Sequence, residues 1–127
     1  MEPLDDLERA VLEMLVRGDA SSTRRLQEQL TVCRVGARER TGVGFFTKLR
    51  VDRTEVEPMD IGSARVGDVV AEIDGLQHGA GFLLTIAEGY LDELEGYSFD
   101  ERWPEEIVSF TLAYTEEPRD LTALTTP

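Results

Sequence analysis

The spacing of apolar residues changes once along this chain, near Val32, and that change most limits the folds available to it. Before Val32, apolar residues recur at three- and four-residue steps, the period of an amphipathic helix. After it, β-branched and aromatic residues alternate with other residues and are separated by glycines, as in strands joined by turns. Helices followed by consecutive hairpins are typical of an α+β domain.

Two helices are predicted before this change. The first carries an apolar stripe formed by Leu4, Leu7, Val11, Met14 and Leu15. Gly18 suits its end, and acidic residues near its start agree with the helix dipole. The second is expected over Ser21–Thr31, with Asp19 or Ser21 as its N-cap. Because the joint is short, the helices should form a hairpin or an L-shaped pair whose apolar faces need a sheet to cover.

About five strands are expected to follow. The strand-like segments are 34–40, 43–51, 69–74, 82–87, 90–97 and 109–115. Segment 82–87 is apolar at nearly every position, as in a central strand, and 90–97 breaks strict alternation. Glu88-Gly89 predicts a two-residue hairpin turn, and Gly96 predicts a bulge or bend. Pro104, followed by two acidic residues, predicts a single helical turn. The sequence thus predicts one domain over 1–115, in which two N-terminal helices pack on a strongly bent, mainly antiparallel sheet, and a frayed tail over 116–127.

The charge of the chain is concentrated in its second half. The net charge is -13; residues 1–65 hold 11 Lys or Arg and 12 Asp or Glu, whereas residues 66–127 hold 2 and 14. Net charges of -1 and -12 follow for the two halves. Nucleic acids and anionic membranes bind clustered basic residues, so neither is expected as a partner.

Nothing in the sequence predicts export or membrane insertion. No apolar run approaches the roughly 20 residues that span a bilayer, and the first residues are acidic where a secretion signal is basic. Cys33 is the only cysteine, so an internal disulfide is excluded. It is best explained as a small buried hydrophobe, and the cytoplasm is the expected location.

His78 is the only histidine and lies in a glycine-rich loop. A loop histidine can serve in acid–base chemistry, but it can equally be a turn residue beside glycines. The glycine spacing over 75–81 matches no phosphate-binding motif, so no nucleotide or other cofactor is predicted.

Acidic residues and aromatics gather in the second half. The acids are Asp92, Glu93, Glu95, Asp100, Glu101, Glu105 and Glu106. Their spacing matches no calcium loop and lacks zinc-type neighbours, so no metal site is predicted. They form either a solvated face or a surface for a basic protein, with Tyr97 and Trp103 as core residues or as aromatic anchors.

Arg38 and Arg40 share parity on the strand predicted over 34–40, so both side chains should point to one face. Either they form intramolecular ion pairs with the acids of the second half, or they line a pocket for an anionic ligand.

Four stretches of this chain resemble a group of short bacterial proteins of unknown function. They are TGVGFFT at 41–47, GDVVAEI at 67–73, HGAGF at 78–82 and LEGY at 94–97. The resemblance covers about residues 4–112 and implies a stand-alone bacterial α+β domain. It implies no activity and no functional residue.

Two functions follow as hypotheses. The first is a non-catalytic binding module that presents an acidic, aromatic-bearing surface to a basic protein, as small acidic inhibitors of basic toxins do. The second is a small enzyme or ligand-binding protein with a polar site around His78, Glu95 and Arg38 or Arg40. In either case a homodimer would cover the open edges of the sheet.

Overall fold

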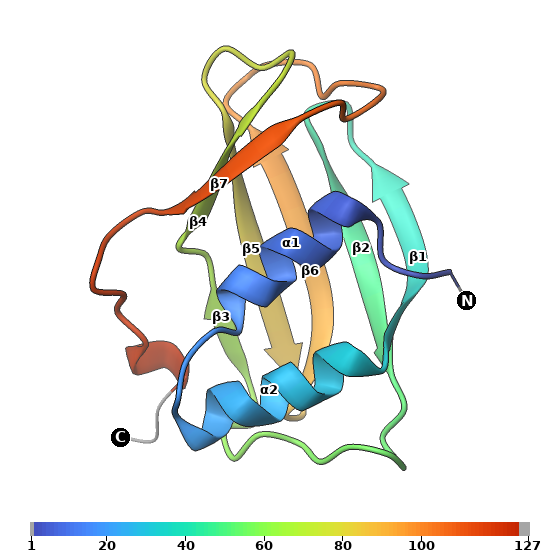
Figure 1. Ribbon diagram of the computed structural model, residues 1–127. Helices are drawn as coiled ribbons and strands as arrows, with labels where there is room; N and C mark the ends of the chain where they lie inside the picture. Colours follow the sequence, from blue (N-terminus) through green and yellow to red (C-terminus); the bar gives the residue numbers. More distant parts are fainter. Residues whose placement is uncertain (1, 125–127) are drawn as a thin grey trace.

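The computed structural model describes residues 2–124 and shows two helices on an antiparallel sheet (Figure 1). The helices are α1 (Asp6–Leu15) and α2 (Ser21–Thr31). The strands are β1 (Cys33–Arg40), β2 (Gly44–Val51), β3 (Ala64–Val66), β4 (Val69–Ile73), β5 (Ala80–Ala87), β6 (Tyr90–Ser98) and β7 (Phe110–Tyr114), followed by the 3-10 helix η1 (Thr122–Leu124). The α+β class is confirmed. Neither helix in this part of the chain is long and apolar enough to cross a membrane.

Helix α1 begins with a reciprocal cap. The Asp5 carboxylate accepts a hydrogen bond from the Glu8 backbone at 2.8 Å, and the Glu8 carboxylate accepts one from the Asp5 backbone at 2.8 Å. This capping box satisfies two N–H groups that have no partner within the helix. It places Glu8 in the first turn, pointing toward the sheet.

Helix α2 has the predicted bounds but a different cap. Ala20 is the N-cap and makes no side-chain hydrogen bond, so the prediction of Asp19 or Ser21 is wrong. Thr23 donates its hydroxyl to the Ala20 carbonyl at 2.9 Å instead. The helix is therefore held mainly by packing, since Leu26 is completely buried and Leu30 nearly so.

The sheet has seven strands where about five were expected, in the order β1-β2-β6-β5-β4-β7. Strands β3 and β4 both pair with β5, at opposite ends of the same edge. The register between them shifts by one residue across Gly67-Asp68, so the two short strands act as one interrupted strand. A three-residue strand such as β3 is too short to show alternation, so the sequence does not predict it.

Glu88-Gly89 forms the predicted turn between β5 and β6. Its φ angles of 54° and 81° are those of a two-residue hairpin that needs two left-handed residues.

The bulge predicted near Gly96 is wrong, because β6 stays in register there and the shift lies at Asp92. Gly96 has another role: a Cβ on it would lie 2.3 Å from the Phe45 ring. The helical turn predicted after Pro104 is absent, and residues 103–109 are irregular.

Helix α1 lies between the two edge strands of the sheet, β1 and β7, which do not pair with each other anywhere in residues 2–124 (Figure 1). Its first turn binds Arg38 of β1, and near its end the Met14 carbonyl accepts a hydrogen bond from the Tyr114 hydroxyl of β7 at 2.7 Å. The core below it includes Phe82, Leu84 and Leu94, all fully buried. The helix thus bridges an open sheet.

The segment after β7, expected to be a frayed tail, contacts the domain as far as Leu124. Arg119 forms two hydrogen bonds to the Asp68 carboxylate, at 2.6 and 2.8 Å, and Leu124 is 1% exposed beside β3. Residues 125–127 lie outside the described residues. The described part of this segment is therefore anchored.

Candidate functional site

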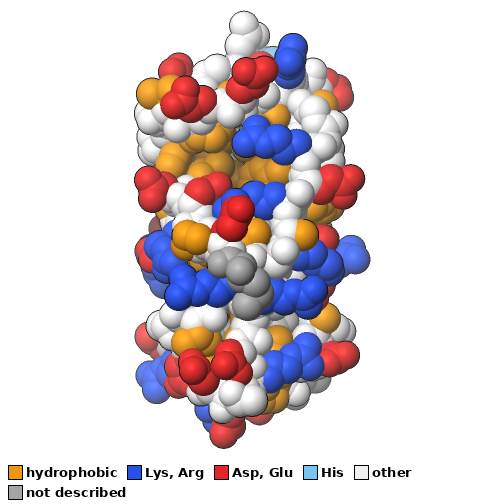
Figure 2. All heavy atoms as spheres, turned by 90° about the vertical axis from the view of Figure 1, so that its right-hand side faces the viewer, with side chains coloured by type: hydrophobic (Ala, Val, Ile, Leu, Met, Phe, Trp, Pro, Cys, Tyr) orange, Lys and Arg blue, Asp and Glu red, His pale blue; other side chains and the backbone are white. Residues whose placement is uncertain are grey.

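A cavity of about 400 Å³ opens where α1 does not fill the space between the two edges of the sheet. We call it the edge cavity. Its walls are the first turn of α1, one end of β1 and β2, and the segment from Trp103 to Phe110. It is lined by Asp5, Asp6, Leu7, Glu8, Arg38, Arg40, Phe45, Trp103, Pro104, Glu105, Glu106, Ile107, Val108 and Phe110. Seen from the β1 side, the molecule has a hollow with hydrophobic side chains inside and charged ones around it (Figure 2).

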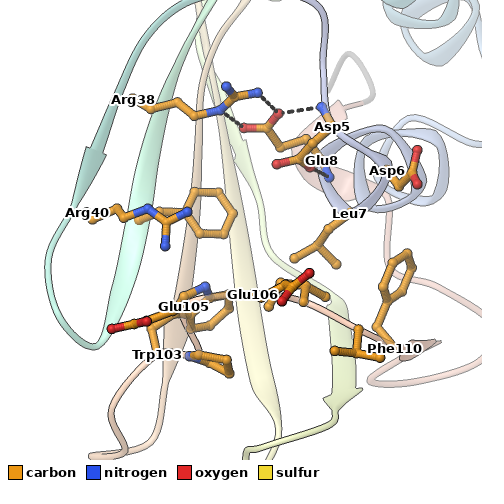
Figure 3. Close-up of a pocket in the computed structure, with 14 residues that line it drawn as sticks. Asp5, Asp6, Leu7, Glu8, Arg38, Arg40, Trp103, Glu105, Glu106 and Phe110 are labelled. Carbon is orange, nitrogen blue, oxygen red and sulfur yellow. Dashed lines mark hydrogen bonds and ion pairs between the residues drawn. The ribbon is translucent and has the colours of Figure 1, made fainter.

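Glu8 is a buried carboxylate at the back of this cavity, with its side chain 2% exposed. It accepts hydrogen bonds from Arg38 Nε and Nη2 at 3.0 and 2.7 Å, from the Thr47 hydroxyl at 2.6 Å and from the Asp5 backbone (Figure 3). Burial alone would raise the pKa of Glu8, but these hydrogen bonds outweigh it and the pKa is lowered. Glu8 therefore stays ionised and has no free lone pair for chemistry.

Arg38 is committed to the same network. Besides Glu8, it donates to the Glu2 carboxylate at 2.7 Å and to the Pro3 carbonyl at 3.3 Å. The hydrogen bonds to Glu8, with the nearby carboxylates, raise the pKa of Arg38 further. Arg38 does form intramolecular ion pairs, but with Glu2 and Glu8 of the first half of the chain, so the predicted pairing with acids of the second half is wrong for this residue. These pairs tie β1 to the start of α1.

The apolar part of the cavity contains an aromatic pair. The rings of Phe45 and Trp103 meet edge to face, with centroids 5.5 Å apart and planes at 69°. The Trp103 backbone N–H donates to the Gly42 carbonyl at 2.8 Å, which fixes the start of the 103–110 wall. Leu7 points into the space above Trp103 from α1 (Figure 3). Trp103 is only 8% exposed, so it forms a wall of the cavity instead of a protruding anchor.

The rim of the cavity carries charges that the fold does not use. Within residues 2–124, Arg40, Asp6 and Glu106 form no ion pair or side-chain hydrogen bond. Glu105 lies 3.7 Å from Arg102, but both side chains are at least 84% exposed, so this pair contributes little. The rim thus offers three acidic groups and one basic group to a ligand.

Glu95 and Tyr97 lie on the other face of the sheet. Arg38 pairs with Thr47 of β2, and Thr47 pairs with Leu94 of β6, so these three residues share the helix-covered face. Glu95 is the next residue along β6 and points away from that face. Tyr97 has the same parity as Glu95, and its ring packs on Phe99 with centroids 5.8 Å apart.

His78 lies in a separate hollow of about 740 Å³, beside Phe99 and Glu72. Its backbone N–H donates to the Glu101 carboxylate at 2.9 Å, and the Gln77 backbone donates to the same group at 2.8 Å. These bonds lower the pKa of Glu101. The structure therefore gathers Arg38, Arg40 and Trp103 in one cavity and separates them from His78, Glu95 and Tyr97.

Glu8 was missed as a site residue by sequence reasoning. One signal was available, because Glu8 lies four residues after Leu4, four before Leu12 and seven before Leu15. These spacings place Glu8 on the apolar stripe of the helix. An acid in the middle of a buried stripe needs a buried partner. The partner comes from β1, thirty residues later, and no local pattern indicates it.

Cys33 is buried, and burial raises the pKa of its thiol to about 11, so the thiol is not activated. Across residues 2–124, no group of three or more His, Cys, Asp or Glu side chains is placed to hold a metal ion. Comparison of the chain with protein-family models, curated proteins and solved structures found no match.

Proposed function

We propose that this protein is a non-catalytic binding module whose edge cavity receives part of a basic protein partner. One observation carries the proposal: a hollow with apolar walls is framed by unpaired carboxylates, in a chain of net charge -13. Apolar surface supplies affinity when it is buried, and complementary charge speeds encounter and selects the partner. The acidic, aromatic-bearing surface expected from the sequence is placed, in this proposal, at the cavity rim.

The residues that line the cavity favour binding over catalysis. None of them is Ser, Thr, Cys, His or Lys, so hydroxyl, thiol, imidazole and amine nucleophiles are missing from its walls, and the only candidates are carboxylates. The one buried carboxylate, Glu8, is saturated by hydrogen bonds and has a lowered pKa, so it is unsuited to donating a proton.

A second candidate function is the binding of a small anionic ligand. Arg40 supports it, because this side chain lines the cavity and forms no ion pair with the rest of residues 2–124. The cavity volume also lies within the range of small-molecule pockets. A ligand with an apolar body and a carboxylate would meet Phe45, Trp103 and Arg40.

The two candidates are separated by capture of partners from lysate on the immobilised protein at low and high salt. The triple variant D6N/E105Q/E106Q removes the acids of the rim, and E55Q/D60N/E116Q makes the same change of charge at exposed positions elsewhere. We expect the wild type and the second variant to retain a basic protein at low salt, and the first to lose it. Capture that is absent, insensitive to salt or equal in both variants would refute the proposal.

We also propose that the chain belongs to the group of short bacterial proteins and lies in the cytoplasm. We further propose that its sheet is strongly bent and that it forms a homodimer. The dimer has one structural support: within residues 2–124 the outer edges of β1 and β7 pair with no other strand, and the edge of β1 is bridged only by Glu2 at Val35. Gel filtration of the purified chain tests it, because a dimer elutes at twice the mass of 14.2 kDa.

A further inference from the structure

We propose that the occupant of the edge cavity is an extended peptide segment with one bulky apolar side chain flanked by Lys or Arg residues. This inference rests on the binding function proposed above and specifies the chemistry of the partner. It follows from how apolar and charged groups are divided between the inside of the cavity and its rim.

The inside of the cavity suits a single apolar group. Leu7 of α1 and Phe45 of β2 line it, and the ring of Trp103 packs edge to face on Phe45. The polar groups at the back, Glu8 and Arg38, already hydrogen-bond to each other. A polar group placed deep in the cavity would therefore lose its water without gaining a partner, whereas an apolar side chain would bury surface at no such cost.

The acids stand on two different walls. Asp6 belongs to the first turn of α1, and Glu105 and Glu106 belong to the irregular 103–110 wall; Figure 3 shows Asp6 and Glu105 on opposite sides of the cavity. A ligand that satisfies both walls needs an apolar group at its centre and cations reaching outward on two sides. A peptide meets this requirement, because side chains two residues apart in an extended segment point to the same side and are roughly 7 Å apart along the chain, so a central apolar group and two flanking cations can all face the cavity.

Arg40 limits how such a segment is placed. It projects from the β1 wall, so a Lys or Arg side chain on that side would be repelled. The same guanidinium can donate a hydrogen bond to a backbone carbonyl of the segment. The cations of the partner are therefore expected at the α1 and 103–110 walls.

The test uses Trp103 as the reporter, since it is the only tryptophan of the chain and lines the cavity. The protein is titrated with acetylated and amidated peptides of sequence GKGFGKG, GKGAGKG and GEGFGEG, whose phenylalanine does not interfere with tryptophan emission. We expect GKGFGKG to shift the Trp103 emission. Replacement of Phe by Ala should weaken binding about tenfold, and replacement of Lys by Glu should weaken it at least as much.

Variants of the protein provide a second test of the inference. D6N/E105Q/E106Q should bind GKGFGKG about tenfold more weakly, while E55Q/D60N/E116Q, with an equal change in net charge, should stay within about twofold of the wild type. Circular dichroism confirms that both variants are folded.

Equal affinity for the three peptides, or no shift of Trp103 emission with any of them, would overturn the inference. Equal weakening in both variants would overturn it as well, because the attraction would then be one of total charge. If capture of a partner from lysate still depends on the rim acids but none of the peptides binds, the proposed function stands and only the inference of a peptide segment is wrong. If capture is also independent of the rim, the proposed function itself fails.

Discussion

The two ends of helix α1 are fixed to the sheet by the same chemistry but in different surroundings. At the N-terminal end, the Glu8 carboxylate takes two hydrogen bonds from Arg38 of β1. At the C-terminal end, Arg119 forms two hydrogen bonds to Asp68 and donates to the carbonyls of Leu15 and Arg17 at 3.1 and 2.9 Å. The helix dipole favours both arrangements, because it attracts an acid such as Glu8 at the N-terminal end and a base such as Arg119 at the C-terminal end.

The difference lies in burial and in what surrounds each pair. Glu8 is 2% exposed in its side chain and Arg38 is 33% exposed, whereas Arg119 and Asp68 are 10% and 17% exposed. Arg119 also stacks on the Tyr114 ring, at 4.4 Å from its centroid, so these side chains join the C-terminal end of α1 to β7. The N-terminal end is left beside the edge cavity. Helix α1 is thus joined to β7 at one end and leaves a cavity beside β1 at the other.

The largest effect should come from breaking the N-terminal pair. In E8Q, Arg38 keeps its charge but loses a charged partner in a nearly dry site, and the carboxamide cannot accept all the former hydrogen bonds. We expect the free energy of unfolding to fall by about 3 kcal/mol, measured by urea denaturation.

A matched pair of variants tests the cause. In E8M/R38M both charged groups are replaced by apolar side chains, and this variant should be more stable than E8M alone. If E8M/R38M is the less stable of the two, the ion pair is not what holds this end of the helix.

A smaller loss is expected at the C-terminal end. R119M removes the two hydrogen bonds to Asp68 and the cap on the helix carbonyls, but both groups are partly hydrated. The expected loss is about 2 kcal/mol in the same denaturation experiment. R119K retains the charge without the paired geometry and should fall between R119M and the wild type. A loss larger than that of E8Q would reverse the comparison of the two ends.

The smallest effect concerns pH. The folded pKa of Glu8 lies below its ordinary value of 4.5, so its contribution to stability is complete above that value and disappears as the pH falls through the folded pKa. Asp5 acts in the opposite sense, because burial raises its pKa above 3.8 and favours the folded state at low pH. E8Q retains the Asp5 carboxyl and the burial that raises its pKa, so the difference between the two proteins reports Glu8 together with the part of the Asp5 shift that the Glu8 charge causes.

The stability difference between wild type and E8Q should be constant above about pH 5 and should shrink in more acidic solution. Urea titrations from acid to neutral pH measure it. A difference that grows on acidification would mean that the folded pKa of Glu8 is raised instead.

The helices and the hairpins were predictable because their signals are local. The stripe from Leu4 to Leu15 needs only the helical period, and Glu88-Gly89 needs only two residues that accept a positive φ. The parity of Arg38 and Arg40 on one strand also follows from alternation, and in the structure both line the same cavity. Such features depend on neighbours within a few residues.

The site was only partly predictable. Trp103 and the two arginines come from segments more than sixty residues apart, and their meeting depends on the order β1-β2-β6 and on the irregular path after β6. The parity of β6 relative to β2 then placed Glu95 on the opposite face from Arg38. Sequence reasoning grouped His78 and Glu95 with the arginines on residue type alone, and residue type carries no information on which face a side chain occupies.

The sequence by itself determined that the chain starts with two amphipathic helices, continues as antiparallel strands and carries its excess acid in the second half, since period, turn residues and charge are properties of short stretches. The tertiary structure alone decided that Glu8 meets Arg38 and that α1 leaves a cavity under the rim of Asp6, Glu105 and Glu106. The reason is physical. Pairings between distant segments are selected by the burial of the whole apolar surface, and that selection acts on the folded chain, not on any stretch of it.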